Sequence, residues 1–209
     1  MIKVLFATGN ESKTKRFKQG LLKNDIEIIT INDIEPKIEI DENGKNAIEN
    51  AHIKAKAYAN ICNYPVFAMD DNLYIDGIPE DKQPGMFVRR VNGKRLTDEE
   101  MIKYYSQLAH DYGENGKLTC RWVYGIVVIN NGIESTYSWS KEDFFIVEKP
   151  SDKIRTGYPL DTISINKKLN KYFTDITAED KKMINEDESD VIEFLCKNLK
   201  INEKNKTTY

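Results

Sequence analysis

The stretch IKVLFATGNESK, residues 2–13, decides how the chain begins to fold. Its apolar part, residues 2–7, is typical of a short buried strand, and residues 11–23 have the apolar spacing of a helix. The three residues between them, 8–10, contain a glycine and predict a tight turn. The chain therefore opens with a strand, a turn and a helix, which is the unit from which α/β proteins are built.

Strand and helix patterns alternate along the rest of the sequence. Strands are predicted at 26–31 and 65–71, and helices at 46–60, 96–108 and 188–199. The helix at 96–108 opens with a predicted capping box, in which Thr97 is the N-cap and Glu100 follows three residues later. The segment 65–71 is apolar on both faces, so we expect a strand that is buried on both sides and ends at Asp70. This alternation predicts an α/β fold.

A long β-hairpin is predicted in the second half of the chain, at residues 117–149. Asn131-Gly132 lies there between two runs rich in Val, Ile, Tyr and Trp, which is a strong signal for a hairpin turn. We expect residues 1–199 to form one domain of two lobes, an α/β portion and the hairpin arm, followed by a polar tail at 200–209.

The composition argues against several classes of protein. The chain has 209 residues, of which 40% are hydrophobic and 31% charged, and its net charge of −3 gives no electrostatic reason to expect nucleic-acid binding. Three widely spaced cysteines and two histidines predict neither a disulfide framework nor a zinc site. No apolar run approaches the ~20 residues of a membrane span or resembles the core of a signal peptide. We therefore expect a cytoplasmic protein with no membrane partner.

The predicted turn at residues 8–10 is a candidate phosphate site. A helix that starts directly after a glycine-containing turn presents free backbone N–H groups and a positive dipole end, and both favour an anion. Lys13 lies one turn into the helix and could reach the same anion. On these residues alone, a simple helix cap made by Thr8, Asn10 or Ser12 is the favoured interpretation.

Two groups of carboxylates are candidate metal ligands. Glu39, Asp41 and Glu42 precede the second predicted helix, and Asp70 and Asp71 lie at the predicted end of a buried strand. Hard oxygen ligands of this kind suit Mg²⁺. Solvent-exposed charge is the simpler interpretation for Glu39 and Asp41, whereas two adjacent acids at the end of a buried strand indicate a ligand site.

Four segments in sequence order carry a resemblance to a known family. They are FATGNESK, DENGKNAIENAHIKA, VFAMDDNLYIDG and PGMFVRR. Together they resemble the motifs ATGNxxK, ETGxTFxENAxxKA, ADDSGLxVDAL and PGxxSAR of the inosine triphosphate pyrophosphatase family, which hydrolyses non-standard purine nucleoside triphosphates. GYPLD, residues 157–161, resembles the family's FGYDP element. The resemblance implies a twisted mixed sheet flanked by helices, in two lobes with a central nucleotide cleft.

The resemblance also implies roles for the residues that match the motifs. Substrate contacts are implied for Thr8, Gly9, Asn10, Lys13, Asn72, Arg90, Gly157, Tyr158 and Lys181. Mg²⁺ would be held by Glu42, Asp70 and Asp71. A water would attack the α-phosphorus and lose its proton to Asp71, while Lys13 and Lys54 offset charge on the leaving pyrophosphate. Arg90 could instead serve packing or a dimer contact.

The departures from the family motifs are heaviest where the base is bound. The family acid three residues after the first lysine is Arg16 here, and the aromatic before GYDP is Thr156. Asn185, Glu186 and Asp187 stand where the family has Ser-His-Arg. Ionised acids accept hydrogen bonds and cannot donate them, so we expect the preference for deaminated purines to be reduced or shifted.

The motifs favour an enzyme, a Mg²⁺-dependent nucleoside triphosphate pyrophosphatase, because the lysine and the acids of the phosphate side are retained. The alternative is a nucleotide-binding protein of the same fold with little or no turnover. A third class, the Maf-like pyrophosphatases, shares the broad fold but lacks this set of motifs. The resemblance predicts a homodimer. The hairpin points the same way, because we do not expect one small lobe to bury fully its apolar residues Trp122, Val123, Tyr124 and Tyr137.

Overall fold

The computed structural model describes residues 1–184 and 188–200. Asn185, Glu186 and Asp187, and all of the expected tail after Lys200, lie outside the described residues. The helices and strands follow one another as β1 (Ile2–Phe6), α1 (Glu11–Leu22), β2 (Ile26–Thr30), α2 (Ala47–Ala59), β3 (Val66–Ile75), β4 (Arg90–Val91), β5 (Lys94–Arg95), α3 (Asp98–Tyr112), β6 (Lys117–Asn130), β7 (Ile133–Val147), β8 (Ser164–Asn166), β9 (Lys171–Tyr172), α4 (Ala178–Ile184) and α5 (Ser189–Leu199).

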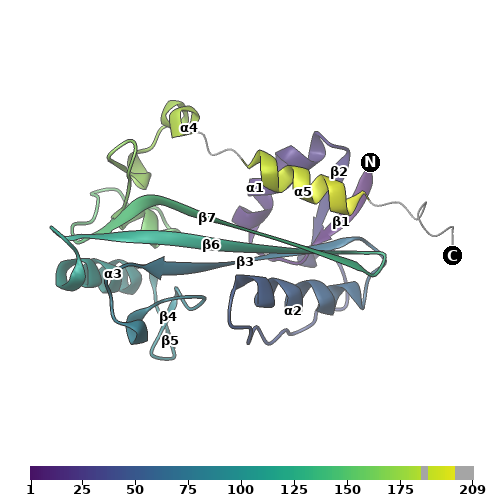
Figure 1. Cartoon of the computed structure of the whole chain (residues 1–209), viewed down its shortest axis with the longest axis horizontal. Coiled ribbons are helices and arrows are strands. Elements are labelled where there is room, and N and C mark those ends of the chain that lie inside the picture. The colour runs from purple at the N-terminus through teal and green to yellow at the C-terminus, as the bar shows by residue number, and fades with distance from the viewer. Residues whose placement is uncertain (185–187, 201–209) are drawn as a thin grey trace. The chain divides into compact units, whose positions relative to one another are not determined.

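Seven of the strands form one mixed sheet, in the order β2-β1-β3-β6-β7-β8-β9. Strand β1 pairs in parallel with β2 and β3, whereas β7 pairs antiparallel with β8. The predicted mixed sheet flanked by helices is therefore confirmed (Figure 1). By its contacts the chain divides into two compact units, and the strands β3, β6 and β7 contribute to both.

The first unit contains Met1–Asp71, Tyr124–Trp139 and α5, and it is built in three layers. Successive side chains of a strand point to opposite faces of the sheet. Phe6 accordingly packs in a buried cluster with Phe17 of α1 and Leu195 of α5, whereas its neighbour Leu5 packs with Ala51 of α2. Helices α1 and α5 thus cover one face of this part of the sheet, and α2 covers the other (Figure 1).

The second unit contains Asn72–Val123 and the segment from Ser140 through α4. Its core joins Leu73 of β3, Tyr105 of α3 and Leu118 of β6. Helix α3 begins with the predicted capping box, in which the Thr97 hydroxyl accepts from the Glu100 N–H at 3.2 Å and the Glu100 carboxylate accepts from the Thr97 N–H at 2.9 Å. The predicted start of this helix is therefore confirmed.

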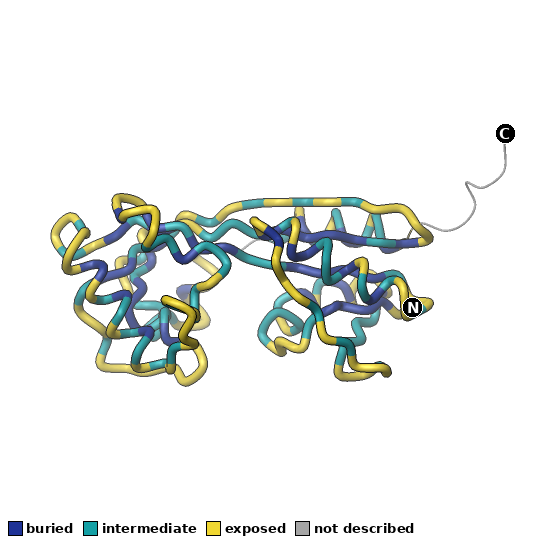
Figure 2. Tube along the Cα trace, turned by 90° about the horizontal axis from the view of Figure 1, so that it is seen from below, coloured by how far each residue is buried: buried dark blue, intermediate teal, exposed yellow. Residues whose placement is uncertain are grey.

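The hairpin turn between β6 and β7 is confirmed at Asn131-Gly132. Both residues have positive φ, 50° and 75°, which is what a two-residue hairpin turn of this sequence adopts. From Glu134 to Glu142, exposed and half-buried residues alternate along β7 (Figure 2). One face of this strand is therefore exposed to solvent, and the other is partly buried against the core.

The prediction that strand β3 ends at Asp70 is wrong. The strand continues through both aspartates to Ile75, because the apolar pattern resumes at Leu73 and Ile75, which are fully buried in the second unit. The two acids therefore lie inside a strand rather than at its end. No helix in the described part of the chain has both the length and the apolar character needed to cross a membrane.

Candidate active site

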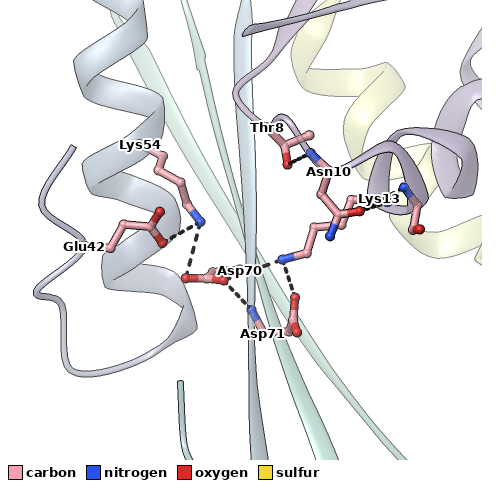
Figure 3. A network of polar contacts seen from close by, with 8 residues as sticks. Thr8, Asn10, Lys13, Glu42, Lys54, Asp70 and Asp71 are labelled. Atoms are coloured by element: carbon pink, nitrogen blue, oxygen red, sulfur yellow. Dashed lines mark hydrogen bonds and ion pairs between the residues drawn. The ribbon is translucent and has the colours of Figure 1, made fainter. Parts of the chain in front are cut away.

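The turn at residues 8–10 caps α1, with Asn10 as the N-cap. The Asn10 side-chain oxygen accepts from the N–H groups of Ser12, at 2.9 Å, and Lys13, at 3.4 Å. The Asn10 N–H in turn donates to the Thr8 hydroxyl at 3.1 Å (Figure 3). The helix-cap interpretation is confirmed, and three backbone donors of the turn are used internally. Phosphate binding here would therefore depend on the Lys13 side chain rather than on the backbone alone.

Lys13 reaches from α1 to the two aspartates of β3. Its ammonium group pairs with the Asp71 carboxylate and lies 3.6 Å from Oδ1 of Asp70 (Figure 3). Burial lowers the pKa of Lys13, but the two carboxylates more than offset this, so that its pKa is raised above the ordinary value. Lys13 is therefore a firmly charged group at neutral pH.

Lys54 reaches the same place from the opposite side of the sheet, on α2. Its ammonium group lies 3.0 Å from Oε2 of Glu42 and 3.4 Å from Oδ2 of Asp70 (Figure 3). The side chains of Lys54 and Asp70 are only 13% and 15% exposed, whereas Glu42 is 45% exposed. Asp70 is thus held between two lysines, one from each neighbouring helix.

This five-residue set, Lys13, Lys54, Glu42, Asp70 and Asp71, is called the lysine–carboxylate network below. Three carboxylates face two ammonium groups, so its formal charge is −1. The two lysines explain how adjacent aspartates are tolerated within a continuous strand, since each buried charge has a partner. An incoming polyphosphate can compete for the lysines, because it offers them more negative charge than the carboxylates do.

The carboxylates of this network fit a magnesium ion that arrives with phosphates. Among residues 1–184 and 188–200, no group of three or more His, Cys, Asp or Glu side chains is arranged to hold a metal ion on its own. Mg²⁺ is commonly bound through one or two carboxylates together with substrate phosphates rather than in an all-protein cage. Asp70 and Asp71 supply oxygen ligands of that kind. Glu39 and Asp41 are exposed, in agreement with the simpler interpretation of these two acids.

The remaining predicted contacts lie in the second unit. Asn72 is 2% exposed, and its amide donates to the Tyr74 hydroxyl at 3.3 Å. Its side-chain oxygen is buried and accepts no hydrogen bond from the part of the chain that the structure describes. Arg90 is exposed and lines a cavity of about 550 Å³ beside Phe87 and Tyr104. Lys181 is exposed on α4.

Gly157 is held in place by two residues that the motifs did not identify. Its φ of +83° lies in the left-handed region, and its N–H donates to Oδ2 of Asp98 at 2.7 Å. Arg89 binds the other oxygen of Asp98, also at 2.7 Å. The hydrogen bonds from Arg89 and Gly157 hold the pKa of Asp98 below its usual value. Tyr158 follows with its side chain partly exposed and the Arg155 guanidinium 4.4 Å from its ring centre.

Asp98 and Arg89 could not be identified from sequence. Asp98 reads as an ordinary first-turn acid of a capped helix, and Arg89 as the neighbour of the motif arginine. Asn185, Glu186 and Asp187, on which the predicted change in base preference rests, are not among the described residues. The structure thus brings together, in the first unit, residues that the resemblance assigns to the phosphates, and it links Gly157, which the resemblance places near the base, to α3 in the second.

Comparison with known proteins identifies relatives along nearly the whole chain. The dITP/XTP pyrophosphatase of Bacillus subtilis is 30% identical over 200 residues, covering 95% of this chain and 98% of the relative. That of Oceanobacillus iheyensis is 29% identical over 185 residues, covering 88% and 91%. Among solved structures, a HAM1 protein from Coxiella burnetii has a TM-score of 0.69 at 26% identity, covering 94% of this chain and 98% of the other. The Staphylococcus aureus Ham1 protein has a TM-score of 0.70 at 23% identity, covering 92% and 97%.

The family assignment rests on a match that spans most of the chain. Residues 4–189 match the Ham1 family, a span that includes the phosphate-side motifs and the GYPLD segment. The pyrophosphatase relatives and the shared fold agree with that match. The resemblance to the inosine triphosphate pyrophosphatases is thereby confirmed, and the chain belongs to the Ham1 family.

Proposed function

We propose that this protein is a Mg²⁺-dependent nucleoside triphosphate pyrophosphatase, which hydrolyses an NTP or dNTP to the monophosphate and pyrophosphate. The observation that carries the proposal is the lysine–carboxylate network beside the capped start of α1. A triphosphate that draws both lysines toward its own charge would leave the acids free to hold a cation and to accept a proton. The activity for which the Bacillus subtilis relative is named supports the same reaction.

In the proposed reaction, a water oxygen forms a bond to the α-phosphorus while the bond from that phosphorus to the oxygen bridging to the β-phosphate breaks. Asp71 takes the proton that the water loses, and pyrophosphate leaves with the bridging oxygen and its electron pair. Lys13 and Lys54 stabilise the negative charge on the leaving group. Mg²⁺, when bound through Glu42, Asp70 and Asp71, supplies further polarisation of the phosphate oxygens.

Other substrate contacts are assigned from the positions of the remaining motif residues. We assign them to Thr8, Gly9, Asn10, Asn72, Arg90, Gly157, Tyr158 and Lys181. The exposed ring of Tyr158 offers a surface for a base, and the buried side-chain oxygen of Asn72 is an acceptor that a ligand donor could satisfy. Arg90 and Lys181 supply exposed positive charge.

We further propose that the base preference is altered, toward a modified or amino-bearing base. Thr156 offers no aromatic ring at the position where the family has one that stacks on the base. Glu186 and Asp187 are acids at positions where the family has hydrogen-bond donors. The test measures pyrophosphate release with Mg²⁺ from ITP, XTP, ATP, GTP and dCTP, with kcat/KM for each. A strong preference for ITP and XTP contradicts the altered base preference. If the protein binds these nucleotides but releases pyrophosphate from none of them, it is a nucleotide-binding protein rather than an enzyme.

We also propose a homodimer, in the cytoplasm, with residues 1–199 working as one domain. The hairpin side chains Tyr124, Tyr137 and Trp139 are only half-buried against the core, and the surface they leave open supports a contact with a second copy. Three free cysteines, Cys62, Cys120 and Cys196, suit a reducing compartment.

A further inference from the structure

Arg16 and Glu188 form an ion pair between α1 and the residue that precedes α5. Nε of Arg16 donates to Oε1 of Glu188, and the two side chains are only 22% and 15% exposed. The guanidinium carbon also lies 4.6 Å from the ring centre of Tyr124 and 5.5 Å from that of Trp139, which stack on each other. The arginine is therefore held by a carboxylate and by aromatic faces at once, an arrangement that suits its flat guanidinium.

This ion pair lies at one end of a close contact between the two helices. Gly20, one turn after Arg16, faces Ile192, one turn after Glu188, and a Cβ added at Gly20 would lie 2.7 Å from the Ile192 side chain. The helices are thus matched over two consecutive turns. Lys13 lies on the turn of α1 directly before Arg16. The helix contact therefore extends to the turn next to the one that carries Lys13.

We propose that the Arg16–Glu188 pair positions Lys13 for substrate binding, an inference that rests on the proposed function of the lysine–carboxylate network. Lys13 and Arg16 belong to one rigid helix, so a rotation or shift of α1 moves both. Arg16 is a positioning residue, since it acts through Lys13 and its own contacts are with Glu188 and the aromatic rings. Arg16, which stands where the family motif has an acid, thus pairs with an acid from another part of the chain, Glu188.

The size of the effect follows from how strictly a phosphate contact depends on geometry. A displacement of about 1 Å can lower the rate by up to about 100-fold. Removal of one member of a largely buried ion pair also leaves an uncompensated charge, which can destabilise the fold. Substitution by glutamine at one or both positions separates the displacement of Lys13 from the destabilisation of the fold. The single variants leave one unpaired charge, whereas the double variant leaves none.

The experiment compares Arg16→Gln, Glu188→Gln and the double variant with the wild type. Lys18→Gln is the matched control, because it removes one positive charge from an exposed position of the same helix. The measurements are Tm, the affinity for inorganic tripolyphosphate, and kcat and KM with Mg²⁺ for whichever of ITP, XTP, ATP, GTP and dCTP the wild type hydrolyses best. We expect each single variant to lose about tenfold or more in kcat/KM and in tripolyphosphate affinity. The double variant should lose no more than the worse single one, because the two residues act as a unit.

A lower Tm with unchanged kcat/KM and unchanged tripolyphosphate affinity would show that the pair is only structural and overturn the proposal. Equal losses in the Lys18→Gln control would overturn it as well, since net charge alone would then suffice. If the single variants fail to fold, the double variant decides the question by the same measurements. A wild type that binds tripolyphosphate but releases no pyrophosphate refutes the proposed function. In that case the tripolyphosphate affinities of the variants alone decide whether the pair positions Lys13. A wild type that neither binds tripolyphosphate nor hydrolyses any of the nucleotides refutes both the proposed function and the positioning role.

Discussion

Removal of the Lys54 ammonium should make the nucleotide-free protein bind a divalent cation more tightly. Lys54 contributes one of the two positive charges that face Glu42, Asp70 and Asp71. Lys54→Met keeps a long unbranched side chain but changes the formal charge of the network from −1 to −2. The variant should also bind triphosphate more weakly, because one of the two groups that meet the phosphates is gone.

The magnitude follows from the burial of the pair. Unit charges about 4 Å apart interact by about 4 kcal/mol at an effective dielectric constant of about 20, whereas exposed ion pairs contribute about 0–1 kcal/mol. Lys54 and Asp70 are 13% and 15% exposed, between these two cases. We therefore expect cation binding to gain about 1–2 kcal/mol, which corresponds to roughly 5- to 30-fold in affinity.

The assay titrates nucleotide-free protein with Mn²⁺, a paramagnetic substitute for Mg²⁺, and measures free Mn²⁺ by electron paramagnetic resonance. Lys56→Met is the matched control, because Lys56 is an exposed lysine two residues away on the same helix. It should bind Mn²⁺ within about twofold of the wild type, as expected for a screened surface charge. Equal or weaker Mn²⁺ binding by a folded Lys54→Met variant would refute the reasoning, since the lysine would then not compete with the cation for Asp70.

Three more variants and one assembly measurement test the rest of the site. Asp71→Asn should lose about 10²- to 10⁴-fold of the pyrophosphate release while it still binds nucleotide, and full activity would remove Asp71 as the proton acceptor. Lys13→Ala should weaken triphosphate binding more than monophosphate binding in parallel titrations; an equal loss would place Lys13 outside the phosphate site. Asp98→Asn should lower Tm at pH 7. The pKa of Asp98 is lowered in the fold, so its stabilisation is present above the unfolded value of about 3.9 and is lost as pH falls through the folded value. The difference in Tm should therefore shrink below about pH 4, and a constant difference would contradict this. Light scattering should give about twice the 24.2 kDa of one chain, and a mass of 24.2 kDa would refute the homodimer.

The sequence by itself determined the features that depend on neighbouring residues. The cap at Asn10, the capping box at Thr97 and the turn at Asn131-Gly132 each arise from hydrogen bonds or backbone angles within a few positions, and all three are found where the pattern places them. The family motifs work in the same way, because each is a short run whose residue types can be read directly. They identified the candidate phosphate residues and the family.

The tertiary structure alone decided how residues distant in sequence meet. Within the continuous strand β3, Asp70 is neutralised by Lys13 of α1 and Lys54 of α2, which no pattern around Asp70 reveals. The support of Gly157 by Asp98 and the pairing of Arg16 with Glu188 join positions 59 and 172 residues apart. No local pattern encodes such pairs, because a charged side chain on a helix looks the same in sequence whether it faces water or a partner. Only the packing of α1, α2 and α5 around the sheet determines which charges are brought together and held out of solvent.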